Sequence, residues 1–161
     1  MRFEKSGTEK TIMKEFCLRA VLIAALAMPG AMAKAQTLTP DQQAVVGTWD
    51  FHDGGICEVR IEKGKLYGKI IHTDKKVDNG GVCKKCEGAL KNKPFVGMDW
   101  LYGFTPEGTT PKWGGGAMVD YATGILYRGK IWTEDGGKTL NVRGYVGNPI
   151  LGQTIVWKRI K

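Results

Sequence analysis

Histidines are scarce in this chain of 161 residues, and several common catalytic motifs are missing. Neither His52 nor His72 stands beside a serine or cysteine that it could activate as a nucleophile. The sequence contains no glycine-rich phosphate-binding loop and no His-Glu-x-x-His metal motif, and its carboxylates show no pairing typical of glycosidases. We therefore expect a protein that is not an enzyme and that holds no metal or other cofactor.

Clustered charge is also absent, although the chain is basic overall. The formal net charge is +8, and after residue 35 there are 18 Lys and Arg residues against 13 Asp and Glu residues. In that part the basic residues adjoin one another at 75–76, 84–85 and 158–159, and elsewhere they are single. Nucleic-acid binding normally uses a continuous basic patch, so we expect an ordinary solvated surface and no nucleic-acid partner.

An apolar run near the N-terminus has the features of an export signal. Residues 20–28 are apolar, follow a basic segment and precede small residues that end at Ala35. This order is typical of a secretory signal peptide, and the run is much shorter than the about 20 residues of a transmembrane helix. We expect residues 1–35 to be a cleaved signal peptide and residues 36–161 to form a single β-barrel domain. The expected location is periplasmic or secreted, without a transmembrane anchor.

Three cysteines follow the expected signal peptide: Cys57, Cys83 and Cys86. The Cys83-x-x-Cys86 pair allows three interpretations. An oxidising compartment favours a structural disulfide that pins a long connection. A zinc site would need two further ligands from Cys57 and the two histidines. A redox dithiol would have its pKa lowered by the two intervening lysines.

Alternating apolar and polar residues predict an all-β domain after a short helical turn. Residues 39–42 (Thr-Pro-Asp-Gln) have the form of a capping box, which predicts a short N-terminal helical turn. From Val46 onward the pattern has the two-residue period of strands; Cys57, Val59 and Ile61, for example, alternate with charged residues. The expected strands are 46–51, 56–62, 66–72, 95–104, 113–120, 125–133, 139–147 and 153–160.

The connections between these strands favour one architecture. The last four expected strands are joined by short turns, and glycines recur inside strands, as strongly curved barrels require. We predict an eight-stranded antiparallel up-and-down barrel, lipocalin-like, rather than a sandwich of two sheets. Gly47-Thr48-Trp49 begins the first strand, and we expect Trp49 to plug one end of the barrel. Arg159, or Arg143 as the second choice, would pack on its indole and contribute about 0.5–2 kcal/mol.

The same alternation predicts which aromatic side chains point inward. It places the even-numbered residues of 98–104 inside the barrel, and it groups Trp113 with Gly115 and Ala117 on one face. The residues expected to line a ligand site are Trp100, Tyr102, Trp113 and Tyr127. We expect a small apolar molecule to bind there. The alternative is a filled barrel that serves as an envelope scaffold, or as a protein-interaction module through the loop that contains Cys83 and Cys86.

Five segments form an ordered series across the expected domain. They are 66–70, 91–98, 113–120, 124–127 and 140–147. The series resembles the bacterial family called domain of unknown function 2147, and the resemblance extends from about Val46 to Ile160. It implies an exported protein with a lipocalin-like barrel and no established activity, and it leaves the ligand open.

Overall fold

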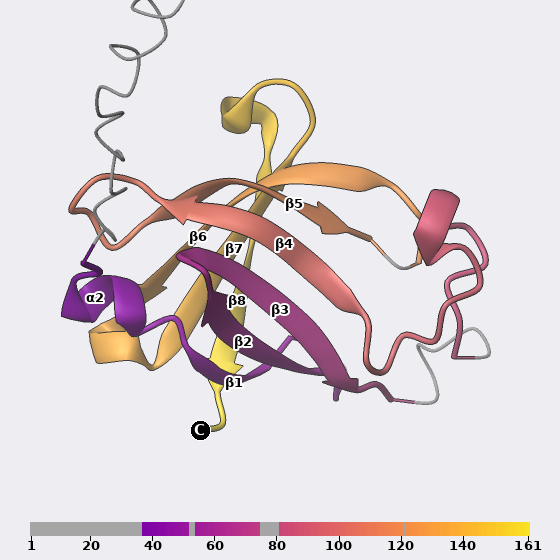
Figure 1. The fold of residues 1–161 in the computed structure, drawn as a ribbon, viewed down its shortest axis with the longest axis horizontal. Helices are drawn as coiled ribbons and strands as arrows, with labels where there is room; N and C mark the ends of the chain where they lie inside the picture. The colour runs from indigo at the N-terminus through magenta and orange to yellow at the C-terminus, as the bar shows by residue number, and fades with distance from the viewer. Residues whose placement is uncertain (1–36, 52–53, 75–80, 121) are drawn as a thin grey trace, which may run out of the picture. The chain divides into compact units, whose positions relative to one another are not determined.

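The computed structural model describes residues 37–51, 54–74, 81–120 and 122–161, and within them eight antiparallel strands close into a barrel in chain order (Figure 1). The strands are β1 (Gly47–Asp50), β2 (Ile56–Glu62), β3 (Lys65–His72), β4 (Asp99–Pro106), β5 (Trp113–Val119), β6 (Leu126–Glu134), β7 (Thr139–Tyr145) and β8 (Gln153–Arg159). The predicted all-β, up-and-down barrel is confirmed. The expected signal peptide and His52 lie outside the described residues.

Pairing between β1 and β8 closes the sheet. Trp49 lies opposite Arg159, and Asp50 lies opposite Lys158. Every other strand pairs with its neighbours in sequence, so the described strands leave no open edge. All of them belong to the compact unit Ala35–Lys161.

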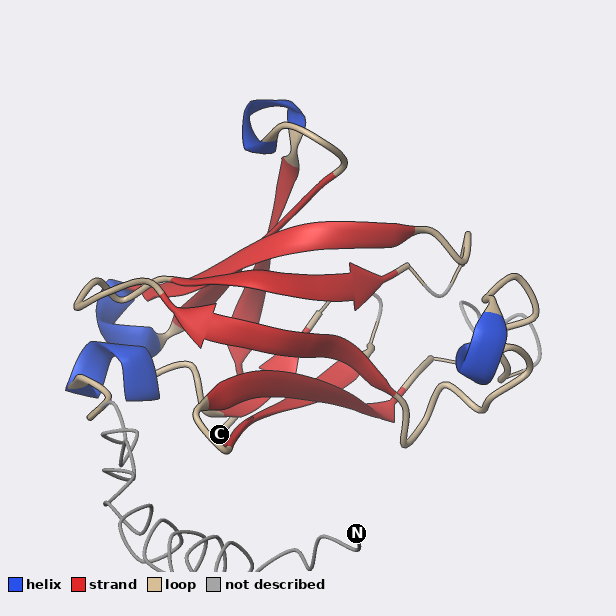
Figure 2. Cartoon of the chain, turned by 45° about the horizontal axis from the view of Figure 1, so that its top comes forward, coloured by secondary structure: helices blue, strands red, loops and turns tan. Residues whose placement is uncertain are grey.

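A short helix, α2 (Pro40–Gln43), covers one end of the barrel, which we call the closed end (Figure 2). The predicted capping box is present: the Thr39 side chain accepts from the Gln42 backbone, and the Gln42 side chain accepts from the Thr39 backbone. The Gln42 amide also donates to the carbonyl oxygens of Gly108 and Thr110, at 2.8 and 2.9 Å. These bonds fasten α2 to the connection between β4 and β5.

The half of the barrel nearest α2 is filled with side chains. Its fully buried members are Trp49, Leu66, Phe104, Trp113 and Ile131. Two of the indoles are fixed by hydrogen bonds, from Trp49 to the carbonyl oxygen of Val45 and from Trp113 to that of Gln42. Burial of this many large apolar groups stabilises a small barrel, so we expect this half to be the rigid part of the molecule.

Irregularities in β4 and β5 correct the predicted inward faces. The register shifts between Trp113 and Gly116, and Gly115 has a φ of +70°. Such a bulge reverses the alternation beyond it, so Met118 is buried while Gly115 is exposed and Ala117 half-buried. The β3–β4 register shifts twice in the same way.

The connection from β3 to β4 is longer than predicted. The fourth strand begins at Asp99 and not at residue 95, because residues 95–98 turn through Gly97, whose φ is +92°. The described parts of this connection are 73–74 and 81–98; the second contains the short 3₁₀ turn η1 (Gly88–Leu90) and an isolated bridge between Val82 and Pro94.

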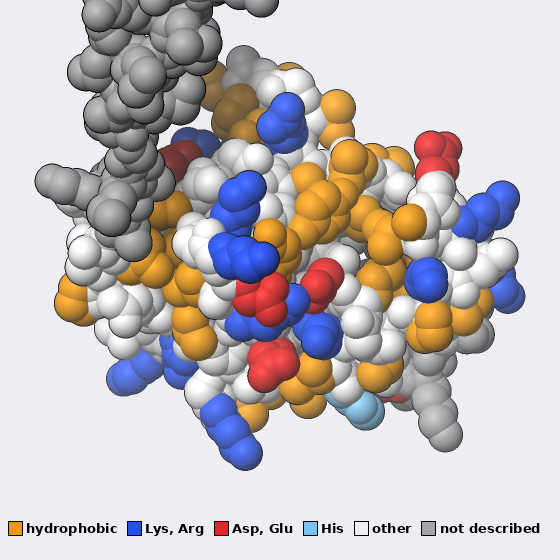
Figure 3. Space-filling view, in the orientation of Figure 1, with side chains coloured by type: hydrophobic (Ala, Val, Ile, Leu, Met, Phe, Trp, Pro, Cys, Tyr) orange, Lys and Arg blue, Asp and Glu red, His pale blue; other side chains and the backbone are white. Residues whose placement is uncertain are grey.

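Charges on the surface are mixed. On the face seen in Figure 3, basic side chains lie next to acidic ones and form no continuous patch. Arg60 pairs with Asp99 at 2.7 Å and with Glu62 at 2.9 Å. These two carboxylates raise the pKa of the Arg60 guanidinium, so it remains charged.

Candidate functional site

A cavity of about 610 Å³ lies at the end of the barrel where β5 leads into β6 and β7 leads into β8. We call this the open end. The barrel is thus filled in one half and hollow in the other. A volume of this size is within the usual range of small-molecule sites.

Three aromatic rings form the floor of the cavity: Phe51, Trp100 and Trp157. The indoles of Trp100 and Trp157 are stacked, with centroids 5.3 Å apart and planes within 9°. Phe51 is tilted against both of them, at 4.7 and 5.6 Å. This cluster is one rigid apolar surface, because each ring is packed against the other two.

The walls of the cavity are also largely apolar. Met118 and Val119 of β5, Tyr127 of β6 and Val142 of β7 contribute them. The remaining lining residues are Asp120, Ala122, Gly144, Tyr145, Val146, Leu151, Gln153 and Ile155.

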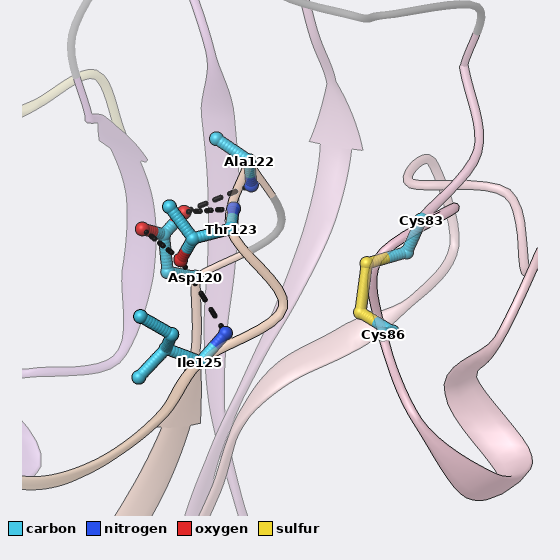
Figure 4. The surroundings of a disulfide bond; sticks show 6 residues. All are labelled: Cys83, Cys86, Asp120, Ala122, Thr123 and Ile125. Atoms are coloured by element: carbon cyan, nitrogen blue, oxygen red, sulfur yellow. Dashed lines mark hydrogen bonds between the residues drawn. A yellow bond between two sulfur atoms is a disulfide. The ribbon is translucent and has the colours of Figure 1, made fainter.

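Asp120 is the one charged residue among the described residues that line the cavity. Its carboxylate is occupied by the β5–β6 turn: it accepts from the backbone nitrogens of Ala122 and Thr123 and from the Thr123 hydroxyl (Figure 4). Asp120 therefore caps this turn. The Asp120 carboxylate thus stabilises the turn at the mouth of the cavity.

A disulfide lies beside this turn. Cys83 and Cys86 are bonded to each other, with their Cα atoms 5.3 Å apart (Figure 4). Gly124 of the turn packs so closely on the backbone carbonyl of Lys85 that a Cβ atom there would collide with it. Among the described residues, no group of three or more His, Cys, Asp or Glu side chains could hold a metal ion.

The four predicted lining residues do not all lie at the cavity. Trp100 and Tyr127 line it, whereas Tyr102 and Trp113 do not. Trp113 is buried at the closed end, where its indole donates to Gln42 at 3.1 Å. Tyr102 lies opposite the half-buried Ala117, and its neighbour Leu101 takes the buried position.

Three lining aromatics were missed: Phe51, Tyr145 and Trp157. Phe51 has the same parity as Trp49, two residues before it, and this pattern could have placed it inside the barrel. Trp157 is the buried residue of β8, whose other apolar side chains are exposed. Because Ile155 and Val156 are consecutive apolar residues, the sequence of β8 does not alternate clearly, and its buried face could not be identified.

The two candidate arginines lie at different places. The Arg159 guanidinium lies over the Trp49 ring, 4.1 Å from its centroid. Burial lowers the pKa of Arg159, and the group remains cationic. Arg143 instead binds backbone carbonyls in the β7–β8 hairpin.

Cys57 lies beneath the aromatic floor and is free and fully buried. The Trp100 indole donates to its sulfur at 3.4 Å. Burial raises the pKa of the Cys57 thiol from 9.0 to about 12, although the Trp100 hydrogen bond opposes this shift. We therefore expect a neutral, unreactive thiol in the folded protein.

Replacing Cys57 by alanine should remove part of the loss of stability at alkaline pH. Above pH 9.0 the unfolded thiol ionises while the folded thiol, with a pKa of about 12, stays protonated. The unfolded state then binds fewer protons, so Cys57 should lower the free energy of unfolding by about 1.4 kcal/mol per pH unit in this window. Urea unfolding of both proteins across the window measures the difference. Parallel pH profiles would contradict the prediction.

Comparison with known proteins identifies the family. The model of a family described as "Uncharacterized protein conserved in bacteria (DUF2147)" matches residues 47–159. The chain belongs to this family. The resemblance expected from the sequence is confirmed, and a search of curated proteins found no match.

A solved structure shares the fold. It is the structure of protein HP1028 from the human pathogen Helicobacter pylori, which is described as belonging to the lipocalin family. It is similar to this family member with a TM-score of 0.61 and 20% identity, over 78% of this chain and 85% of the other. The barrel is thus lipocalin-like. No helix in the described part of the chain is both long and apolar enough to cross a membrane.

Proposed function

We propose that this DUF2147 protein is an exported carrier that binds a small apolar molecule in the cavity at the open end. The observation that carries the proposal is the hollow half of the barrel, about 610 Å³, with its floor of three packed aromatic rings. Transfer of an apolar molecule from water onto such a surface is favourable in proportion to the area buried.

The charge of the lining narrows the ligand class. Among the described residues that line the cavity, the single charged one is an acid, Asp120, and its oxygens already accept three hydrogen bonds. An anionic ligand would meet a like charge and no basic partner, so the ligand is a neutral apolar molecule. The part of the lining that the structure describes holds no nucleophile paired with a base, and we propose binding without catalysis.

Export is the second part of the proposal. Its support is the apolar run at residues 20–28, the disulfide between Cys83 and Cys86, and membership of a bacterial family. Disulfides persist in oxidising compartments, which include the periplasm and the exterior of the cell. Finding the protein in the cytoplasm with residues 1–35 intact would exclude this part.

Filling the cavity should abolish ligand binding. Val142 lines the cavity and is 3% exposed, so Val142→Trp places an indole in the ligand's volume. We expect affinity for a neutral apolar fluorescent probe to fall at least about tenfold. Titration of residues 36–161 with the probe, followed by native mass spectrometry, provides the measurement.

A matched control is available on the adjacent strand. Val156→Trp makes the same change at a side chain that is 49% exposed and does not line the cavity. This variant should bind the probe like the wild type. If the two variants bind equally, or if the wild type binds no neutral apolar probe, the carrier proposal is wrong.

A further inference from the structure

The tip of the β7–β8 hairpin is an exposed apolar projection. Figures 1 and 2 both show it standing clear of the other strands, with the 3₁₀ turn η3 (Pro149–Leu151) at its end. Ile150 and Leu151 are each 82% exposed. Two adjacent aliphatic side chains held fully in water are unfavourable unless something covers them.

Hydrogen bonds hold this tip in one conformation. The Arg143 guanidinium donates to the carbonyl oxygens of Pro149 and Ile150 and to the Thr154 hydroxyl, at 2.9–3.1 Å. The Asn148 side chain accepts from the Ile150 backbone nitrogen at 2.9 Å. A side chain bound to three groups of one turn fixes its shape, so the two aliphatic residues are presented in the unbound protein.

The tip is continuous with the mouth of the cavity. Leu151 lines the cavity although it is largely exposed, and so do Val146 and Ile155, which are 66% and 45% exposed. An apolar path therefore leads from the hairpin tip to the aromatic floor.

Two arginines lie near the tip. The other basic residues after Gly136 (Lys138, Lys158, Arg159 and Lys161) lie at the opposite end of the hairpin, toward the closed end of the barrel. Arg143 lies directly beneath the tip, and the exposed Arg128 of β6 pairs with Tyr145 in the same hairpin. An anionic surface would meet these two cations, while the nearby carboxylate of Asp120 is already bonded within its own turn.

We propose that the hairpin tip docks on anionic phospholipid membranes, with Ile150 and Leu151 inserted among the acyl chains. Lipid fits better than a protein partner because the projection is small, convex and aliphatic. Stable protein interfaces bury about 800 Å² on each partner and use aromatic anchors, which the tip lacks. A bilayer needs no complementary shape, and basic residues add affinity for its anionic headgroups.

Docking would also bring the mouth of the cavity to the lipid surface. An apolar molecule could then pass between bilayer and cavity along Val146, Leu151 and Ile155 without crossing open water. The docking proposal does not depend on the identity of the cavity ligand, and it is tested with no ligand present.

Vesicle co-sedimentation of residues 36–161 tests the proposal, since this segment contains the whole described barrel. The wild type should bind vesicles of equal parts phosphatidylcholine and phosphatidylglycerol more tightly than vesicles of phosphatidylcholine alone, and added salt should reduce the difference. Ile150→Ser with Leu151→Ser should weaken binding at least about tenfold. Both side chains are solvated, so thermal unfolding of this variant should match the wild type.

The control removes apolar surface elsewhere. Val46→Ser with Ile160→Ser changes two side chains that are 44% and 48% exposed beside β1 and β8 at the closed end, and it should bind vesicles like the wild type. As a positive variant, Ile150→Trp should show a blue shift of added tryptophan emission with vesicles. The cavity variant Val142→Trp should still bind vesicles, which separates this proposal from the carrier function.

Three results would overturn the membrane proposal. They are no binding of the wild type to either vesicle, unchanged binding after the double change at the tip, or equal loss in the control. If the wild type does not bind vesicles and the tip can be cross-linked to a protein, the surface would be assigned to a protein partner instead.

Discussion

Replacing Arg159 by alanine is expected to lower the free energy of unfolding by about 2–4 kcal/mol. The guanidinium lies 4.1 Å from the centroid of the Trp49 ring. It also donates to the carbonyl oxygens of Ala44, Val46 and Gly137. The variant would leave these acceptors without a charged donor and would expose the Trp49 ring at the closed end. Urea and thermal unfolding measure the loss, with an expected drop in Tm of about 8–15 °C.

Two further variants test whether Arg159 stabilises the protein through its contacts or only through its charge. Lys158→Ala removes the same charge one residue earlier, from an exposed side chain, and should cost less than about 0.5 kcal/mol. Arg159→Lys keeps the charge without the planar fork, so its stability should fall between those of Arg159→Ala and the wild type. If Arg159→Ala unfolded like Lys158→Ala, the closed end would not depend on this residue.

The closed end could be anticipated from the sequence because its signals are local. A glycine and a tryptophan open the first strand, an arginine ends the last, and antiparallel closure brings these two strands together. The same holds for β2, where Cys57 and Val59 are buried and the strand is regular except at its first residue. Where alternation is unbroken, residue parity identifies the buried face.

The open end could not be anticipated in the same way. Residue parity predicts whether a side chain points into the barrel, but it does not predict how far along the barrel axis that side chain lies. Trp113 at the closed end and Tyr127 at the cavity were therefore both predicted to line the ligand site. A single bulge also reverses the parity of every later residue in its strand. The positive φ values of Gly103 and Gly115, +76° and +70°, mark such places, but glycine in a strand also serves simple curvature. The cavity thus depends on irregularities that the alternation does not encode.

Two other glycines, one in β5 and one in β6, leave room for a buried aromatic ring. Gly116 and Gly129 lie opposite each other in β5 and β6. A Cβ atom on either residue would collide with the Phe104 ring, which is fully buried. The ring therefore packs on backbone, an arrangement in which an aromatic side chain covers a glycine of a neighbouring strand. This contact lies at the boundary between the filled half and the cavity, because Met118 touches Gly129 and also lines the cavity.

Gly116→Ala is expected to lower the free energy of unfolding by about 3 kcal/mol, since the surrounded Phe104 ring has no room to move. Gly144→Ala is the matched control: its new Cβ would meet the flexible Met118 side chain at 3.3 Å, and it should cost less than about 1 kcal/mol.

Adding Phe104→Leu to Gly116→Ala should restore part of the loss, with a coupling of at least about 1 kcal/mol between the two sites in a double-mutant cycle of urea unfolding. Additive effects would mean that the ring and the glycine do not act on each other, and the packing of Phe104 on the β5 backbone would not explain why residue 116 is a glycine.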